Sequence, residues 1–185
     1  MLDFFTLKGT LLSEIEQSDA DYQYNINRAV WIDSLTPSQE EKNILQHTLK
    51  DLIPDADDVD DIEDSARRFV DQTGIHVHSL FLSNVAEKTE TVSVACILQS
   101  DKLVTIRDDK IADFRLFRLR AKRGQISCNS PAEILLNLME QKVENLADYL
   151  EDQHRQLEEV STLVLSEEID NPEEVIYSLA ESEDL

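Results

Sequence analysis

Seven carboxylate side chains occur within ten residues of this sequence, and carboxylate oxygens are ligands that hard divalent cations prefer. The residues are Asp55, Asp57, Asp58, Asp60, Asp61, Glu63 and Asp64. Like charges this close repel one another on a helix, so the cluster is costly unless cations or basic side chains lie nearby. Acidic residues are also favoured at the positive end of a helix, and a helix is expected over residues 57–67. The cluster is therefore typical either of a cation site or of an ordinary acidic helix start.

Other candidate chemistry is weaker. A second acidic region, between residues 167 and 184, is typical of a solvated face. His76 and His78 share one face of an expected strand and could bind a transition metal, but no third ligand is identifiable, so a structural role is favoured. The sequence contains no GxSxG, P-loop, GxGxxG or HExxH motif. With only three glycines, a phosphate-cradling loop is not expected, and we predict that the chain is not an enzyme.

The charge balance restricts the partners. The sequence has 39 acidic and 17 basic residues and a formal net charge of −22. A basic face is needed for nucleic acid, so neither nucleic acid nor anionic lipid is an expected partner, whereas cation binding and plain solubility both fit. Seven of the bases lie between Arg107 and Arg123. No nucleic-acid recognition motif accompanies them, and we expect them to pair with the acidic helices.

Compartment and membrane signals are few. Cys96 and Cys128 form neither a CxxC nor a zinc-type spacing, so they are interpreted as reduced and structural, as suits a cytosolic compartment. The N-terminal sequence is not a signal peptide. No stretch approaches the roughly 18 apolar residues that cross a bilayer, so the polypeptide as given is expected to be soluble.

The order of elements predicts a mixed α/β layer. Two apolar runs around Lys8-Gly9 predict a hairpin over residues 2–16, and the polar stretch 19–27 is expected to be a loop. Thr36 and Pro37 are expected to open a helix that Pro54 ends. Further strands are predicted at 29–32, 68–71, 75–82, 91–98 and 102–107, and a helix at 109–123.

The C-terminal third predicts long helices. Ser130, Pro131 and Glu133 form a capping box that starts a helix. Apolar residues then recur at alternating spacings of three and four, as in a heptad seam that needs a partner helix. The seam is Met139, Val143, Leu146, Leu150, Gln153, Leu157, Val160 and Val164, and only Gln153 breaks its apolar character. Asn171 and Pro172 start another helix. We therefore divide the chain into an α/β domain, residues 1–128, and long acidic helices, residues 129–185.

Five segments, in order, resemble those of CorA magnesium transporters, in the version seen in enteric bacteria. Residues 28–37 (RAVWIDSLTP) resemble AVWIDLxxP, residues 59–67 (VDDIEDSAR) the LEDI segment, and residues 74–81 (GIHVHSLF) the strand GLHIHSFF. Residues 112–121 (ADFRLFRLRA) resemble AFRLYRMRA, and residues 134–140 the start of a long acidic helix. Five segments in register are specific, although each alone is weak.

The resemblance implies an α/β fold, namely an αβα sandwich with a mixed β-sheet plus a long C-terminal helical hairpin. It further implies a stalk helix, two membrane helices around a Gly-Met-Asn signature, and a homopentamer in the inner membrane with this segment on the cytoplasmic side. The stalk and membrane segments are absent from the sequence, so membrane contact is expected only through them. The implied role is Mg²⁺ sensing in a magnesium and cobalt transporter, with Co²⁺ or Ni²⁺ as further transported ions.

The resemblance also implies which acids hold regulatory Mg²⁺ between neighbouring subunits. They fall on Asp60 and Asp61, and on Glu140 at the start of the long helix. Asp60 and Glu140 exchange Asp and Glu relative to the family, which keeps a carboxylate but alters its reach. Two alternatives stay open: the cytoplasmic domain of a related zinc transporter, and a soluble acidic protein-interaction module that docks through its heptad seam.

Overall fold

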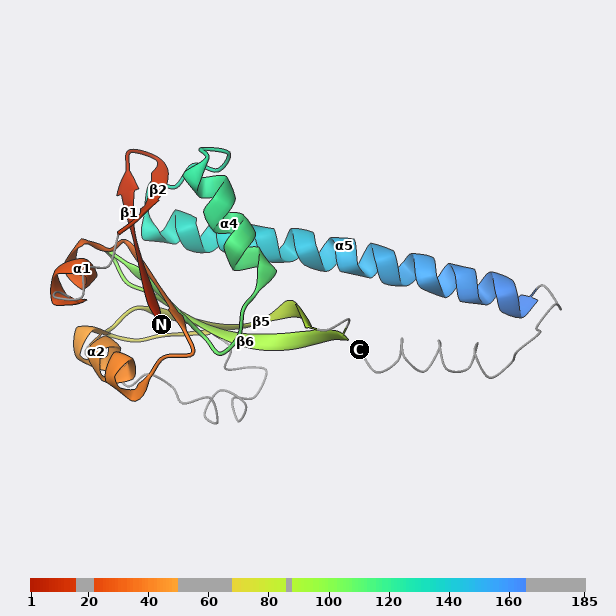
Figure 1. The fold of residues 1–185 in the computed structure, drawn as a ribbon, viewed down its shortest axis with the longest axis horizontal. Coiled ribbons are helices and arrows are strands. Elements are labelled where there is room, and N and C mark those ends of the chain that lie inside the picture. Colours follow the sequence, from red (N-terminus) through yellow and green to blue (C-terminus); the bar gives the residue numbers. More distant parts are fainter. Residues whose placement is uncertain (16–21, 50–67, 86–87, 166–185) are drawn as a thin grey trace. The chain divides into compact units, whose positions relative to one another are not determined.

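A computed structural model describes residues 1–15, 22–49, 68–85 and 88–165 of the chain (Figure 1). The chain divides into two compact units, Met1–Gln141 and a second that begins at Lys142, and each is described by itself. The strands are β1 (Leu2–Lys8), β2 (Leu11–Glu14), β3 (Trp31–Leu35), β4 (Arg68–Val70), β5 (Ile75–Val85), β6 (Lys88–Leu98) and β7 (Leu103–Arg107). The helices are α1 (Tyr22–Arg28), α2 (Gln39–Leu49), α4 (Ala112–Lys122) and α5 (Pro131–Leu165).

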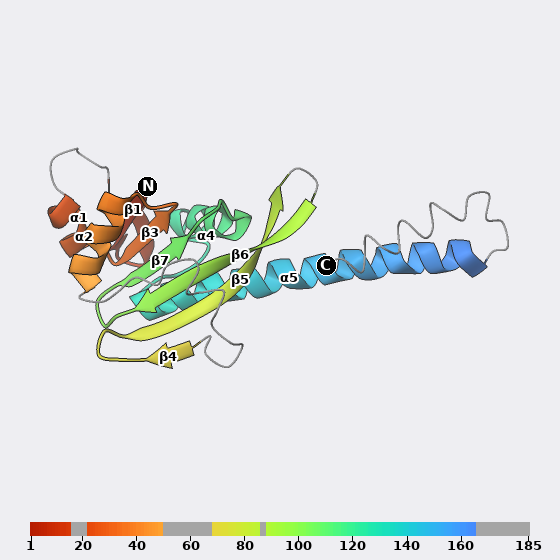
Figure 2. The same cartoon turned by 90° about the horizontal axis from the view of Figure 1, so that it is seen from below.

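The strands form one mixed sheet in the order β2-β1-β3-β7-β6-β5-β4 (Figure 2). β3 and β7 pair in parallel, with Asp33 opposite Thr105, and every other neighbouring pair is antiparallel. Both predicted hairpins are present: Gly9, at φ 64°, turns β1 into β2, and Ser100-Asp101 lies between β6 and β7. The predicted mixed sheet is therefore confirmed.

Side chains alternate across the sheet and build a core on each face. On one face Phe5, Trp31 and Leu103 pack against α4 and the first turns of α5. The indole of Trp31 stacks 4.6 Å from the ring of Phe5 and meets Phe117 of α4 edge-on at 5.5 Å. On the other face the core contains Phe4, Ile32 and Val104 with Ile26 of α1 and Leu45 of α2. The sheet thus lies between two helical layers, as an αβα sandwich (Figure 1).

Two helix starts show how the sequence sets local structure. α2 is capped by Ser38 rather than by Thr36: the Glu41 amide donates to Ser38 Oγ (3.3 Å), and the Ser38 amide donates to Glu41 Oε2 (2.8 Å). Thr36 instead has φ 44° and lies before the helix. At α5 the Glu133 amide donates to Ser130 Oγ (3.2 Å), as predicted. The Glu133 carboxylate reaches back to the amide of Asn129 (2.9 Å).

The prediction of a loop over residues 19–27 is wrong for its second part, where α1 lies. The segment has too few apolar residues for a periodic pattern, because Ile26 is its only fully buried hydrophobic side chain among the described residues. Ile26 and the following Ala29 are anchored in the core on that face of the sheet. Tertiary packing, rather than helical periodicity, accounts for this short helix.

The long helix α5 changes character along its length. Ile134 and Leu138 are fully buried in the core of the first unit, and Gln141 is 5% exposed. Beyond Lys142 four large apolar side chains are exposed, namely Val143 at 63%, Leu146 at 37%, Leu150 at 60% and Leu157 at 43%. The second arm of the predicted hairpin, from Asn171, lies outside the described residues, and the division at residues 128 and 129 stays a prediction. None of the helices in the described ranges has a stretch that is both long and apolar enough to span a bilayer.

Candidate functional site

A buried ion pair joins the two parallel strands at the centre of the sheet. Arg107 Nη2 lies 2.8 Å from Asp33 Oδ2, and Arg107 Nε lies 3.2 Å from Asp33 Oδ1. Asp33 is 1% and Arg107 3% exposed. A charge removed from water this completely requires an opposite charge with good geometry, and the two-point contact supplies it. The pair therefore ties the end of β7 to β3.

Other polar groups complete the surroundings of Asp33. Trp31 Nε1 donates to Thr105 Oγ1 (3.0 Å), and the Thr105 hydroxyl donates to Asp33 Oδ1 (2.9 Å). The guanidinium of Arg118, on α4, lies 3.6 Å from Asp33 Oδ2. The same guanidinium donates to Asp3 Oδ2 on β1 (2.9 Å). Two carboxylates and two guanidinium groups thus form a neutral cluster, which we call the Asp33 network.

The Asp33 network positions α4. Arg118 joins α4 to β1 and β3, and the Arg107 guanidinium lies 4.5 Å from the ring centre of Phe114, a distance typical of a cation–π contact. Because the charges are mutually satisfied, the network suits a role in holding elements together rather than proton transfer. Sequence reasoning assigned no role to Asp33. The available signal was a single charged residue within each of two apolar strand segments.

The bases of residues 107–123 have partners other than those expected. Arg107, Arg118 and Lys122 bind Asp33, Asp3 and Glu14, which lie on β3, β1 and β2. The prediction that acidic helices would neutralise these three bases is therefore wrong. Arg107 lies on β7 itself, beside Asp33 of the neighbouring strand. Because α4 packs on the sheet through its Phe114 and Phe117 face, Arg118 and Lys122 also reach acids on strands.

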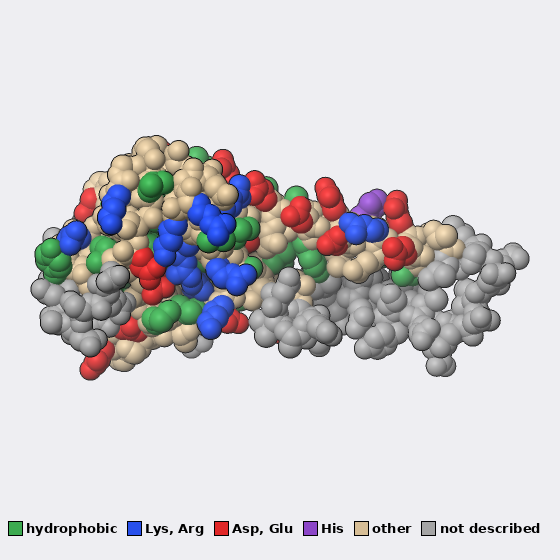
Figure 3. Space-filling model, turned by 45° about the horizontal axis from the view of Figure 1, so that its top comes forward, with side chains coloured by type: hydrophobic (Ala, Val, Ile, Leu, Met, Phe, Trp, Pro, Cys, Tyr) green, Lys and Arg blue, Asp and Glu red, His purple; other side chains and the backbone are tan. Residues whose placement is uncertain are grey.

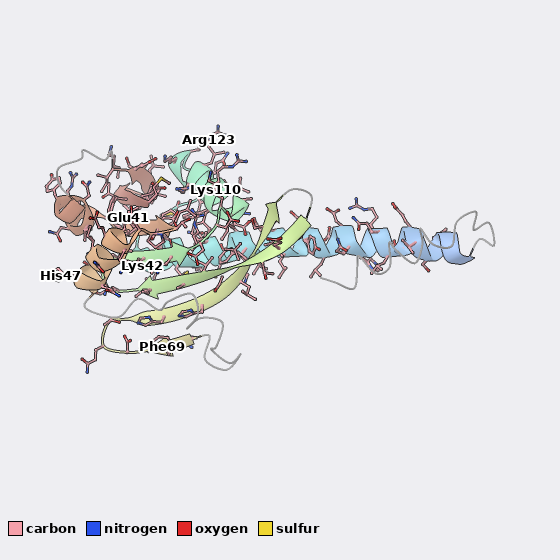
Figure 4. All side chains as sticks on the ribbon, turned by 60° about the horizontal axis from the view of Figure 1, so that its bottom comes forward. Glu41, Lys42, His47, Phe69, Lys110 and Arg123 are labelled. Atoms are coloured by element: carbon pink, nitrogen blue, oxygen red, sulfur yellow. The ribbon has the colours of Figure 1, made fainter. Side chains whose placement is uncertain are left out.

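The two histidines of β5 are buried beside the turn that joins β4 to β5. His76 Nε2 lies 3.1 Å from Asp71 Oδ2 and 2.9 Å from Thr73 Oγ1, and its ring stacks on Phe69 at 4.3 Å. Figure 4 labels Phe69 on β4. Burial, then the nearby charge of His76, lowers the pKa of His78. Hydrogen bonds from Thr73, acting against some burial, lower the pKa of Asp71 to about 2. No third metal ligand joins the two histidines in the described residues.

The structure describes one of the three predicted metal-binding residues. Asp60 and Asp61 lie outside the described residues. Glu140 is exposed on α5, and in the described ranges no ion pair is recorded for it. An exposed carboxylate without a basic partner suits Mg²⁺, which keeps several waters and takes one or two carboxylates. The described residues contain no group of three or more potential ligands. Glu140 could thus contribute one ligand to a site completed by other residues.

Comparison with known proteins identifies the family. The sequence profile described as "CorA-like Mg2+ transporter protein" matches residues 27–183, which is most of the chain. The chain belongs to this family. A curated relative, the magnesium transport protein CorA of Haemophilus influenzae, is 36% identical over 187 aligned positions. That match covers the whole of this chain and 58% of the relative, so the chain spans little more than half the length of such CorA proteins.

Solved structures share the fold. The complete CorA magnesium transporter of Methanocaldococcus jannaschii matches with a TM-score of 0.67 at 15% identity, covering 98% of this chain and 55% of that one. The ZntB cytoplasmic domain of Vibrio parahaemolyticus matches with a TM-score of 0.59 at 10% identity, covering 97% and 72%. At these identities the match concerns the fold alone. The CorA relative reported above is named for transport, which agrees with the prediction that the chain is not an enzyme.

Proposed function

We propose that this chain is the cytoplasmic, Mg²⁺-sensing part of a CorA-type magnesium transporter. The observation that carries the proposal is the family match over residues 27–183, together with full-chain similarity to proteins named for magnesium transport. The exposed carboxylate of Glu140, without a basic partner among the described residues, supports it. The proposal assigns regulatory Mg²⁺ to Asp60, Asp61 and Glu140.

The proposed mechanism is a shift between two states of an assembly. Carboxylates on adjacent subunits repel one another when no cation lies between them. Mg²⁺ would bridge these carboxylates and favour a closed, symmetric assembly, because it binds that state better than the open one. When cytosolic Mg²⁺ falls, the repulsion returns and the closed state loses its support. The Asp33 network would keep α4 fixed on the sheet while neighbouring subunits move.

The same proposal includes the oligomeric state, the membrane location and the transported ions of the whole protein. The whole protein is a homopentamer in the inner membrane, this segment lies on the cytoplasmic side, and the transported ions are Mg²⁺ with Co²⁺ or Ni²⁺. The net charge of −22 is compatible with cation handling. Pore selectivity belongs to the part of CorA proteins beyond this chain.

One alternative has a specific observation in its favour. The fold also matches a ZntB cytoplasmic domain, so the architecture alone fits a zinc transporter as well as a magnesium transporter. Sequence favours the magnesium branch, because a curated magnesium transport protein is 36% identical over the whole of this chain. The acidic interaction module is the other alternative, and its support is the exposed apolar seam of α5.

Metal binding to the purified chain distinguishes these readings. We expect calorimetry to detect Mg²⁺ binding that weakens in a triple variant, Asp60→Asn with Asp61→Asn and Glu140→Gln. A control variant, Glu158→Gln with Glu159→Gln, removes exposed acids from the same helix outside the proposed site and should bind as the wild type does. Preferential Zn²⁺ binding would favour the zinc branch. Equal Mg²⁺ binding by the triple variant and the wild type would contradict the assignment of these acids.

A further inference from the structure

The outer face of α4 combines positive charge with exposed apolar surface. Arg115, Leu116, Leu119 and Arg123 recur at helical spacing, opposite the buried Phe114 and Phe117 face. Leu116 and Leu119 are each 43% exposed, and no ion pair is recorded for Arg115 or Arg123 in the described part of the chain. Figure 3 shows Lys and Arg side chains gathered on this side of the molecule, and Figure 4 labels Arg123 at the end of α4. We call these four residues the α4 face.

The excess of basic over acidic residues around the α4 face is unusual for this acidic chain. Residues 107–123 hold seven of the 17 bases and three of the 39 acids, which leaves ten bases and 36 acids elsewhere. Outside residues 107–123 a second copy of this chain therefore carries a large excess of acidic side chains. Electrostatic complementarity of this kind sets the register and orientation of a contact.

The part of α5 beyond Lys142 has the matching features. Its exposed acids include Asp148, Glu151 and Glu159, and its exposed apolar side chains include Leu150 and Leu157. Glu151 and Glu159 are eight residues apart, which is about 12 Å along a helix. The charges of the α4 face, Arg115 and Arg123, have the same spacing of eight residues. Two arginines can thus meet two glutamates at a matching spacing on the facing helix.

We propose that the α4 face docks the acidic segment of α5, residues 142–160, from a second copy of the chain. The contact joins two different surfaces, so in each pair one copy still has a free α4 face and the other a free α5 segment. Further copies can add at these free surfaces, and the assembly closes into a ring when the rotation between copies permits it. The inference rests on the proposed function in taking the chain as a subunit of a homo-oligomer. It names the surfaces that meet, which the regulatory proposal leaves open.

Charge reversal on each surface tests the contact. One variant of the full chain carries Arg115→Glu with Arg123→Glu, and the other carries Glu151→Lys with Glu159→Lys. We expect the wild type to self-associate in sedimentation at about 50 mM salt and to do so less at about 500 mM, because screening weakens exposed pairs. Each variant alone should associate roughly tenfold more weakly or worse. An equimolar mixture of the two should recover heterodimers, since it restores one complementary interface.

Controls separate this contact from other causes. A matched variant, Arg28→Glu with Arg68→Glu, makes the same charge change away from α4 and should associate as the wild type does. Circular dichroism checks that each variant folds. A monomeric wild type, or two reversed variants that fail to recover association when mixed, would overturn the proposal. Flotation with phosphatidylserine vesicles that requires Arg115 and Arg123, without self-association, would assign the face to anionic lipid instead. Neither outcome depends on Mg²⁺ binding by Asp60, Asp61 and Glu140.

Discussion

Arg107 and Asp33 are 74 residues apart in the sequence, yet their side chains form a two-point ion pair inside the sheet, with Nη2 and Oδ2 separated by 2.8 Å. The contact exists because β3 and β7 pair in parallel, with Leu35 opposite Arg107. Arg118 extends the same pair to α4 and β1. The segment RAVWIDS, which contains part of β3, is thereby joined to the segment ADFRLFRLRA of α4.

Removing the charge of Asp33 should destabilise the first unit strongly. In Asp33→Asn the buried Arg107 loses its compensating charge, a change that typically costs about 3 kcal/mol or more. Urea unfolding followed by tryptophan fluorescence measures the loss, since Trp31 is buried beside the network. Glu14→Gln is the control, because its pair with Lys122 is exposed and should change stability by less than about 1 kcal/mol. Equal stability of Asp33→Asn and the wild type would contradict the structural role of the network.

Two glycines should respond very differently to alanine. Gly74 has φ 151°, and a Cβ there would collide with the carbonyl oxygen of Leu98, so Gly74→Ala should cost about 3 kcal/mol or more. Gly9 has φ 64° with no atom within 4 Å of the added Cβ, so Gly9→Ala should cost only the strain of the left-handed conformation, about 1 kcal/mol. Thermal unfolding of both variants gives the comparison. A milder effect at Gly74 than at Gly9 would mean that the β4–β5 turn is placed differently.

His78 should make folding sensitive to mild acid. Burial and the charge of His76 lower its pKa in the folded chain, whereas the unfolded chain protonates it near the ordinary value of about 6.5. The unfolded state therefore binds more protons as the pH falls through 6.5, and stability decreases in that direction. We expect His78→Gln to flatten the decrease in urea midpoint between pH 7 and pH 5.5. Exposed His47 provides the control, and a His47→Gln variant that flattened the profile equally would contradict the assignment.

Asp71 should affect the pH dependence of folding stability in a lower pH range than His78 does. Its pKa is about 2 in the folded chain, below its ordinary value of 3.8, so the folded state favours the charged carboxylate. Its contribution to stability is present above pH 4 and is lost only as the pH falls from about 4 towards 2. In urea unfolding, Asp71→Asn should therefore lose stability less steeply than the wild type as the pH falls below 4.

Two leucines on α5 should separate the packed part of the helix from its exposed part. Leu138 is fully buried, and Leu138→Ala should cost about 3 kcal/mol by creating a cavity. Leu150 is 60% exposed, and Leu150→Ala should change stability by less than about 0.5 kcal/mol in dilute solution. Denaturation of both variants at several protein concentrations is the measurement. A large effect at Leu150 that grows with concentration would indicate that association covers the seam.

Most strands could be predicted from the sequence because alternation and β-branched residues are local signals, as in Ile75–Val85. α1 could not, since its burial depends on Ile26 meeting a core built by strands far away in sequence. The expected cap of α2, Thr36, lies two residues before the observed cap, Ser38. Both residue types are acceptable caps, and only the Ser38 amide hydrogen-bonds to Glu41. The ends of helices depend on such choices between neighbours.

The site residues also differ in whether local sequence could predict them. Asp33 and Arg107 appear in sequence as isolated charges in apolar strands, and only the parallel pairing across 74 residues reveals them as partners. Arg118 and Lys122 have strand partners that charge counting assigned to helices. Glu140 was identified through family resemblance, and its exposure agrees with a surface role. Asp60 and Asp61 stay predictions.

Transport by the full-length protein tests Mg²⁺ sensing most directly. Mg²⁺ influx into proteoliposomes would be measured with Mg²⁺-free and with millimolar internal Mg²⁺, for the wild type and for Asp60→Asn with Asp61→Asn and Glu140→Gln. We predict that internal Mg²⁺ suppresses influx in the wild type and that the triple variant stays active at both internal concentrations. A triple variant that internal Mg²⁺ still suppresses as strongly as the wild type would contradict the account.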